Sequence, residues 1–376
     1  MTYCAAFIRN GSVHVVADSA VTSSENLEVP RSVFGEEHID AKGTRIQDGA
    51  KKIIVLGDEI LTFAGRYAVG IQLAKQYVKF RANRTPGDAF ELAIISMCPP
   101  PPEGGASALL AAFEHGRPKL WRGVLRLEPI FEAVEDFASF GAAPEVRGKF
   151  DEVVRHVASN AAIGLSDADL NVMAVASCLG VALRDGTINS GVGGAFNAAR
   201  CDQFGVHWLD DSIVATYRCP AGDGWPTFEN TVALSNRNNV FIAREKIGEK
   251  ALITAQIVSD QDTNLALLHR DVREAVNKAL TSVKTGKFAY VAFVSKDTGN
   301  AHVVSMERHP NHLQLRIIPP QQFVGTVEYT LTISPKLRSH IAGRHPHPHC
   351  CFWPYEPVTM RDPARFNIPP GNRFRL

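Results

Sequence analysis

Hydrophobic and polar residues alternate along the first eighteen positions of the chain. Apolar side chains recur at every second position over residues 4–8 and 13–17, and Asn10-Gly11 lies between the two runs. A period of two predicts strands, and Asn-Gly favours a two-residue hairpin turn because both of its residues accept positive φ. We therefore predict a β-hairpin whose second strand ends at Asp18.

The same patterns predict an ordered series of elements as far as about residue 210. Further strands are predicted at residues 52–56, 59–64, 107–113, 119–125, 137–140, 195–198 and 205–209, and helices at residues 66–83, 88–97, 146–161 and 167–183. Residues 19–48 are polar and mixed, which indicates a long connection. Strands and helices grouped in this way are typical of an α+β fold with helices outside packed sheets.

The chain changes character after residue 215. Its next part has strand-like runs at residues 252–258, 289–294, 314–318 and 324–333, and a helical stripe of apolar residues at 265–280. The last part is rich in proline, histidine and arginine. We predict an α+β domain over residues 1–215, a mixed α/β extension over 216–340, and an irregular tail over 341–376.

Composition narrows the class of protein. The chain has 376 residues, of which 45% are hydrophobic, and its formal net charge is +1. This charge does not favour nucleic acid or an anionic membrane as a partner. No apolar run is long enough to span a bilayer, and the start lacks the pattern of a signal peptide. The seven scattered cysteines indicate reduced thiols, so we predict a cytoplasmic protein.

Thr2 is the first candidate for catalysis. Removal of Met1 before a small residue leaves a threonine whose free α-amine lies beside its own hydroxyl. An α-amine has a pKa of about 7.7–8.0 and serves as a general base near neutral pH. A threonine hydroxyl is a weak nucleophile that needs such a base. The alternative is that Thr2 is merely the second residue of a strand.

Three later residues strengthen the case for Thr2. Hairpin closure returns Asp18 to the chain terminus, and Lys52 begins the next predicted hairpin. A lysine lowers the pKa of a nearby hydroxyl, and Asp18 would hold that lysine in place. Gly65 would offer a backbone N–H to the oxyanion. The alternatives are a turn cap for Asp18, a solvated residue for Lys52, and a helix entry for Gly65.

The run from Thr2 to Asp18 resembles the start of a mature proteasome β subunit, a member of the N-terminal nucleophile (Ntn) hydrolase superfamily. Lys52-Ile53-Ile54 and Phe63-Ala64-Gly65 resemble the lysine strand and the Ala-Gly motif of that family. The start Met-Thr-Tyr is also similar to that of Anbu, a bacterial proteasome-like peptidase. The stretch from Asp185 to Ser190-Gly191 resembles the family's Asp-x-x-Ser-Gly loop.

The resemblance implies a fold and an activity. The fold would be a four-layer α-β-β-α sandwich, and the activity hydrolysis of amide bonds in a peptide or protein, with no metal or organic cofactor. Asp185 and Ser190 would hold the Thr2 amine and hydroxyl. The family forms rings or helical stacks, so a homo-oligomer is implied, and an unfoldase partner is left open.

Departures from the family pattern keep two other functions open. The connection from Asp18 to Lys52 is long, Asp185 and Ser190 are five residues apart instead of three, and either Ser139 or Phe140 occupies the place of a supporting serine. These features suit a catalytically inactive structural or interaction protein. A small-molecule amidase with the same nucleophile is the second alternative.

The tail offers one further pattern. His345, His347 and His349 precede two cysteines, and imidazoles and thiols are good ligands for zinc or copper. The alternative, which we favour, is a solvated tail with incidental histidines.

Overall fold

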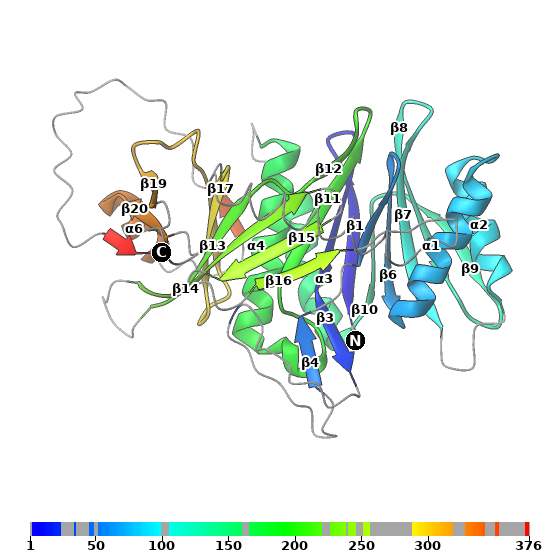
Figure 1. Cartoon of the computed structure of the whole chain (residues 1–376), viewed down its shortest axis with the longest axis horizontal. Coiled ribbons are helices and arrows are strands. Elements are labelled where there is room, and N and C mark those ends of the chain that lie inside the picture. The colour runs from blue at the N-terminus through cyan, green and yellow to red at the C-terminus, as the bar shows by residue number, and fades with distance from the viewer. Residues whose placement is uncertain are drawn as a thin grey trace.

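The computed structural model describes residues 2–23, 34, 45–48, 52–98, 105–159, 165–219, 226–237, 240–245, 251–255, 288–318, 328–342, 350–352 and 373–375. These residues form helices and several largely antiparallel sheets, so the fold is mixed α and β (Figure 1). None of the helices among these residues is both long and apolar enough to span a bilayer.

The first sheet carries the predicted N-terminal hairpin. It has five strands in the order β10-β1-β2-β11-β12: β1 (Tyr3–Arg9), β2 (Ser12–Asp18), β10 (Phe137–Gly141), β11 (Phe196–Asp202) and β12 (Gly205–Trp208). Asn10 and Gly11 have φ angles of 52° and 78°, the positive values that a type I′ turn requires. The hairpin prediction is confirmed, and Asp18 is the last residue of β2.

The second sheet faces the first across a shared apolar core. Its order is β5-β6-β7-β8-β9, with β5 (Ile53–Leu56), β6 (Glu59–Gly65), β7 (Ala106–Glu114), β8 (Arg117–Val124) and β9 (Ile130–Val134). Cys4, Ala6 and Val15 of the first sheet pack against Ile60 and Leu109 of the second. The predicted hairpin around Gly57-Asp58 is confirmed by the pairing of β5 with β6.

Two helix pairs cover the outer faces of these sheets. Helices α1 (Tyr67–Arg81) and α2 (Pro86–Ser96) pack on the second sheet, and α3 (Pro144–Ser159) and α4 (Asp167–Asp185) pack on the first. Helix α2 begins two residues before its predicted start, because Pro86 occupies the first turn and Thr85 caps it by accepting from the Asp88 N–H.

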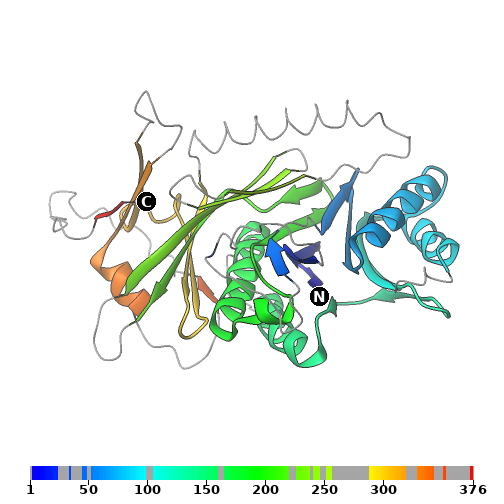
Figure 2. The same cartoon turned by 60° about the horizontal axis from the view of Figure 1, so that its bottom comes forward.

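A third large sheet packs on the other side of α4. Its seven strands run in the order β16-β15-β14-β13-β17-β18-β21: β13 (Ser212–Arg218), β14 (Thr227–Arg237), β15 (Val240–Glu245), β16 (Ala251–Ala255), β17 (Tyr290–Ser295), β18 (Ala301–Ser305) and β21 (Cys350–Phe352). Figure 2 shows the green helices between the blue strands of the first sheet and the yellow strands β17 and β18.

Helix α4 is consequently buried on two sides. All residues from Asp169 to Ala182 are buried, which is unusual for a helix at the surface of a sandwich. At Gly180 the third sheet comes so close that an added Cβ would lie 2.1 Å from the carbonyl oxygen of Gly299. The Tyr290 hydroxyl and the Arg308 guanidinium both donate to Asp169, each at 2.9 Å. The third sheet therefore docks on α4 through apolar, backbone and charged contacts.

The remaining elements are small. The far face of the third sheet packs against a three-stranded sheet and a helix: β19 (Leu313–Ile318), β20 (Glu328–Ile333), β22 (Arg373–Arg375) and α6 (Pro335–Ala342). In the predicted connection 19–48, β3 (Ala20–Ser23) pairs with β4 (Arg45–Asp48). The predicted helix 265–280 and the residues His345, His347 and His349 lie outside the described residues. The predicted domain boundary at residue 215 falls within β13.

Candidate functional site

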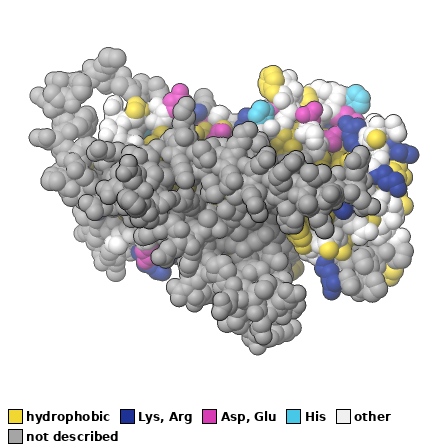
Figure 3. Space-filling view, in the orientation of Figure 1, with side chains coloured by type: hydrophobic (Ala, Val, Ile, Leu, Met, Phe, Trp, Pro, Cys, Tyr) yellow, Lys and Arg dark blue, Asp and Glu magenta, His cyan; other side chains and the backbone are white. Residues whose placement is uncertain are grey.

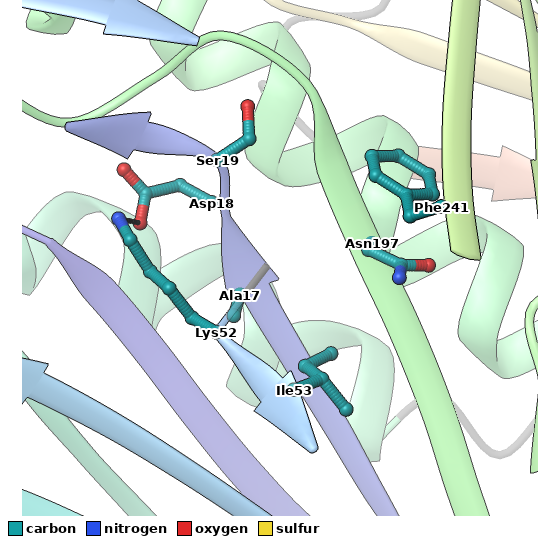
Figure 4. Close-up of a pocket in the computed structure, with 7 residues that line it drawn as sticks. All are labelled: Ala17, Asp18, Ser19, Lys52, Ile53, Asn197 and Phe241. Atoms are coloured by element: carbon teal, nitrogen blue, oxygen red, sulfur yellow. Dashed lines mark hydrogen bonds and ion pairs between the residues drawn. The ribbon is translucent and has the colours of Figure 1, made fainter. Parts of the chain in front are cut away.

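Asp18 and Lys52 form a buried ion pair where the first two sheets meet. The Lys52 Nζ lies 2.6 Å from the Asp18 Oδ1 and 2.6 Å from the carbonyl oxygen of Ala20 (Figure 4). Asp18 ends β2, and Lys52 immediately precedes β5. The structure thus brings together two of the candidate residues that the sequence separates by a long connection.

Two backbone N–H groups also donate to the Asp18 carboxylate. Tyr3 donates to Oδ1 at 3.0 Å and Gly193 donates to Oδ2 at 3.1 Å. Burial raises the pKa of Asp18, and the charge of Lys52 together with these hydrogen bonds opposes that rise. The carboxylate therefore has a fixed position, and it ties the residue after Thr2 to the Lys52 ammonium group.

Thr2 is buried at the start of β1, in close contact with Gly141. Its carbonyl oxygen accepts from the Ala142 N–H at 2.6 Å. An added Cβ on Gly141, whose φ is +99°, would lie 1.7 Å from that oxygen and 3.4 Å from the Cβ of Ala64. Only glycine allows this approach. Thr2 consequently lies beside the end of β6, where Gly65 follows Ala64.

Gly65 also occupies a position that only glycine fits. Its φ is +114°, and an added Cβ would lie 2.8 Å from the carbonyl oxygen of Gly105. It is exposed, unlike the other six residues of β6. An exposed strand end without a side chain therefore lies next to Thr2.

Cys4 is the second nucleophilic side chain near the pair. Its Sγ donates to the carbonyl oxygen of Phe63 at 3.4 Å, and burial raises the pKa of its thiol to about 12. A thiol with this pKa is protonated at neutral pH and is a poor nucleophile. Between the candidate nucleophiles Thr2 and Cys4, the Cys4 thiol is therefore the weaker one.

Asp185 belongs to a different group of charges. It is the last residue of α4, and its carboxylate accepts from the Arg184 Nε at 2.5 Å and from the Lys149 Nζ at 2.8 Å. The hydrogen bond from Arg184, followed by that from Lys149, lowers the pKa of Asp185 to about 2. Asp185 therefore pairs with these two cations and not with Asp18 or Lys52.

Ser190 lies in the segment that leads from Asp185 to Gly193. It ends a 3-10 helix, η1 (Thr187–Ser190). The Thr187 hydroxyl donates to the carbonyl oxygen of Val192 at 2.8 Å, which tightens the turn before Gly193. Sequence reasoning did not single out Thr187 or Gly193. The glycine run at 191–194 was the available signal, but it does not tell which N–H group meets Asp18.

Ser19 and Ser139 also have defined partners. Ser19 exchanges two hydrogen bonds with Ala195, which fixes the end of β2 to the segment after Gly193. The Ser139 hydroxyl donates to Asp151 at 2.9 Å, and the Tyr3 hydroxyl donates to the same carboxylate at 3.0 Å. Ser139 therefore supports the helix layer beneath β1.

A cavity adjoins the ion pair. It has a volume of about 10 Å³, roughly the room that one water molecule needs. Its lining residues are Ala17, Asp18, Ser19, Lys52, Ile53, Asn197 and Phe241 (Figure 4). Phe241 belongs to β15 of the third sheet, whereas the others come from the first two sheets and their connections. Within the part of the chain that the structure describes, no cluster of three or more His, Cys, Asp or Glu side chains is arranged to bind a metal ion.

Comparisons with known proteins show a similarity at the level of the structure. No protein-family model matches the chain, and no curated protein matches it. The structure is similar to a solved structure of the Anbu (Gly-1) mutant from Hyphomicrobium sp. strain MC1, with 12% sequence identity and a TM-score of 0.38. The similarity covers 56% of this chain and 87% of the other.

Proposed function

We propose that this protein is a threonine-type Ntn hydrolase that cleaves amide bonds in peptides after removal of Met1. The observation that carries the proposal is the buried Asp18–Lys52 ion pair, which a backbone N–H next to Thr2 joins to the start of the chain. The two facing sheets and the two helix pairs would then form the α-β-β-α sandwich of this class, with Thr2 at its open end.

Each residue of the site has its own role in the reaction. The Thr2 hydroxyl oxygen attacks the amide carbon, and the Thr2 α-amine takes the hydroxyl proton as general base. The Lys52 ammonium lowers the pKa of that hydroxyl, and Asp18 fixes Lys52 in place. The Gly65 N–H donates to the oxyanion. The amine returns its proton to the leaving nitrogen, and water then hydrolyses the ester to regenerate Thr2.

Asp185 and Ser190 support the site from a distance in this proposal. The pairs of Asp185 with Arg184 and Lys149 fix the end of α4, from which the segment to Gly193 starts. Ser190 ends the 3-10 helix in that segment. We assign both residues a positioning role for the Gly193 N–H, which meets Asp18.

Intact mass spectrometry with a peptide epoxyketone tests the proposal. The reagent forms its ring adduct only with a residue that carries both a hydroxyl and a free α-amine. We expect loss of Met1, one adduct on the wild-type protein, and none on Thr2→Ala. Retained Met1, or processed protein that does not react, would contradict the proposal.

One observation favours a second candidate, an inactive member of the same fold. Asp185 is engaged by two cations instead of by the terminal threonine. In that case Thr2→Ala leaves every activity unchanged. Simple acyl amides, assayed beside fluorogenic peptides, separate a small-molecule amidase from a peptidase.

A homo-oligomer is part of the proposal, because the resembling family assembles. The described surface in Figure 3 carries basic, acidic and hydrophobic side chains close together over the end formed by α1 and α2. Light scattering on the purified protein checks the assembly, and a mass of one chain, 41.0 kDa, would contradict it.

A further inference from the structure

The third sheet reaches the cavity beside the ion pair through Phe241. The ring of Phe241 is 1% exposed and lines this cavity on the side opposite Asp18 and Lys52, whose charged groups point away from the ring (Figure 4). The cavity has room for about one water molecule. Removing the ring would open the far side of this cavity to more water, and the interaction of the charge pair that lines its other side weakens as the local dielectric rises.

Asn236 joins the strand beside Phe241 to the first sheet. Asn236 lies on β14 directly opposite Phe241 on β15. Its side-chain amide forms two reciprocal hydrogen bonds with that of Asn197, each 3.0 Å long, and both residues are buried. Asn197 lies on β11 opposite Ala17, the residue before Asp18. The third sheet is thus joined to the first within one residue of Asp18.

We propose that the third sheet is a working part of the hydrolase site, with Phe241 and Asn236 as positioning residues. The ring of Phe241 closes the side of the cavity opposite the Asp18–Lys52 pair and so limits the water that the cavity can hold, and the Asn236–Asn197 amide pair joins the sheet that carries the ring to the first sheet. The Lys52 charge then acts on the Thr2 hydroxyl without being screened by additional water. This inference rests on the proposed function, and it assigns a role to residues beyond 215.

Phe293 supplies a matched control. It is 0% exposed and belongs to β17 of the same sheet, but it faces the core on the side away from α4. Phe293→Ala removes the same ring from the same sheet without touching the cavity. Phe241→Leu keeps an apolar filler at the cavity and guards against misfolding of Phe241→Ala.

The test combines inactivation kinetics with amide hydrogen exchange. With a peptide epoxyketone, we expect Phe241→Ala to lower the maximal inactivation rate about tenfold with little change in the half-saturating concentration. Asn236→Ala should act in the same direction. Phe241→Leu and Phe293→Ala should stay within about threefold of the wild type. The Tyr3 and Gly193 N–H groups, which bond to Asp18, should exchange faster in Phe241→Ala than in Phe293→Ala.

The outcomes separate this inference from the proposed function. If the wild type reacts at Thr2 and Phe241→Ala reacts equally fast, or if Phe293→Ala loses as much rate, the inference is wrong and the hydrolase proposal stands. If the wild type does not react, the hydrolase proposal fails. Amide exchange then still decides whether the third sheet stabilises the hydrogen bonds of the Tyr3 and Gly193 N–H groups to Asp18. Equal exchange in Phe241→Ala and Phe293→Ala would show that it does not.

Discussion

The ammonium group of Lys52 lies 2.6 Å from the carboxylate of Asp18, and only 5% of the lysine side chain and none of the aspartate side chain is exposed. Removing one partner of a buried pair leaves an uncompensated charge, which costs about 3–5 kcal/mol of stability. We expect Asp18→Asn and Lys52→Met each to lose stability of this order in urea unfolding. Reactivity of Thr2 should also be lost in both.

The double variant Asp18→Asn/Lys52→Met separates the two effects. It carries no unpaired charge, so it should recover most of the lost stability but none of the reactivity. A double variant as unstable as the sum of the single variants would show that the pair does not act as a unit.

Gly141→Ala should disturb Thr2 directly. The new Cβ would overlap the Thr2 carbonyl oxygen at a position whose φ is +99°. Gly116 is the control, since its φ is +74° and nothing lies within 4 Å of an added Cβ. We expect Gly116→Ala to cost about 1–2 kcal/mol of unfolding free energy, from the left-handed backbone alone. Gly141→Ala should cost clearly more and should slow the epoxyketone reaction, whereas equal costs would show that the overlap relaxes easily.

His14 should make stability depend on pH. Its ring is 1% exposed, stacks on Phe7 with 4.7 Å between ring centroids, and has Nδ1 2.8 Å from the Asn171 Oδ1. Burial lowers the pKa of His14, so below about pH 6.5 the unfolded chain binds a proton that the folded protein does not. The folded state therefore loses stability as pH falls through about 6.5, by at most about 1.4 kcal/mol per pH unit from this residue.

The comparison of His14→Gln with the wild type at several pH values checks this expectation. The variant should lose part of the slope of unfolding free energy between about pH 7 and pH 5. His115→Asn, at an exposed turn residue with φ of 52°, should keep the whole slope because asparagine tolerates that backbone. Identical slopes in all three proteins would refute a buried neutral imidazole at position 14.

Gly180→Ala should report on the docking of the third sheet. Alanine favours a helix over glycine by about 0.5–1 kcal/mol, so an exposed helical glycine is a site of gain. Gly148 in α3 is such a site, with nothing within 4 Å of an added Cβ. We expect Gly148→Ala to stabilise the protein in urea and Gly180→Ala to destabilise it, because Gly299 lies against α4 there. A gain at both positions would contradict close docking.

The sequence predicted those strands that are marked by a pattern of neighbouring residues, such as alternation of apolar residues or a turn pair. The hairpin of β1 and β2 follows from alternation and from Asn10-Gly11, and its end at Asp18 was placed correctly. The start of α2 was missed by two residues, although Thr85 and Pro86 are a cap and a first-turn proline. Strands β13 to β15 were not predicted. All described residues in the first six positions of β13 are buried, so the strand has no polar face to mark a period of two.

The sequence predicted the part of the candidate site that depends on where the strands end. Asp18 and Lys52 form their ion pair because the end of β2 lies next to the start of β5. The partners of Asp185 depend on the direction in which the last turn of α4 points its carboxylate. In the structure the carboxylate accepts a hydrogen bond from the adjacent Arg184. The Gly193 contact depends on the torsion angles of a glycine run, and the contribution of Phe241 depends on tertiary packing. Neither of these two contributions produces a recognisable pattern in the neighbouring sequence.

The burial of α4 between two sheets has a consequence for biosynthesis. The strands β17 and β18, which cover its second side, leave the ribosome roughly a hundred residues after α4 itself. During that interval a mostly apolar helix has one side packed and the other open to solvent, a state prone to association with other nascent chains. The native contacts of α4 are therefore completed late, and its second side depends on chaperone protection while translation continues.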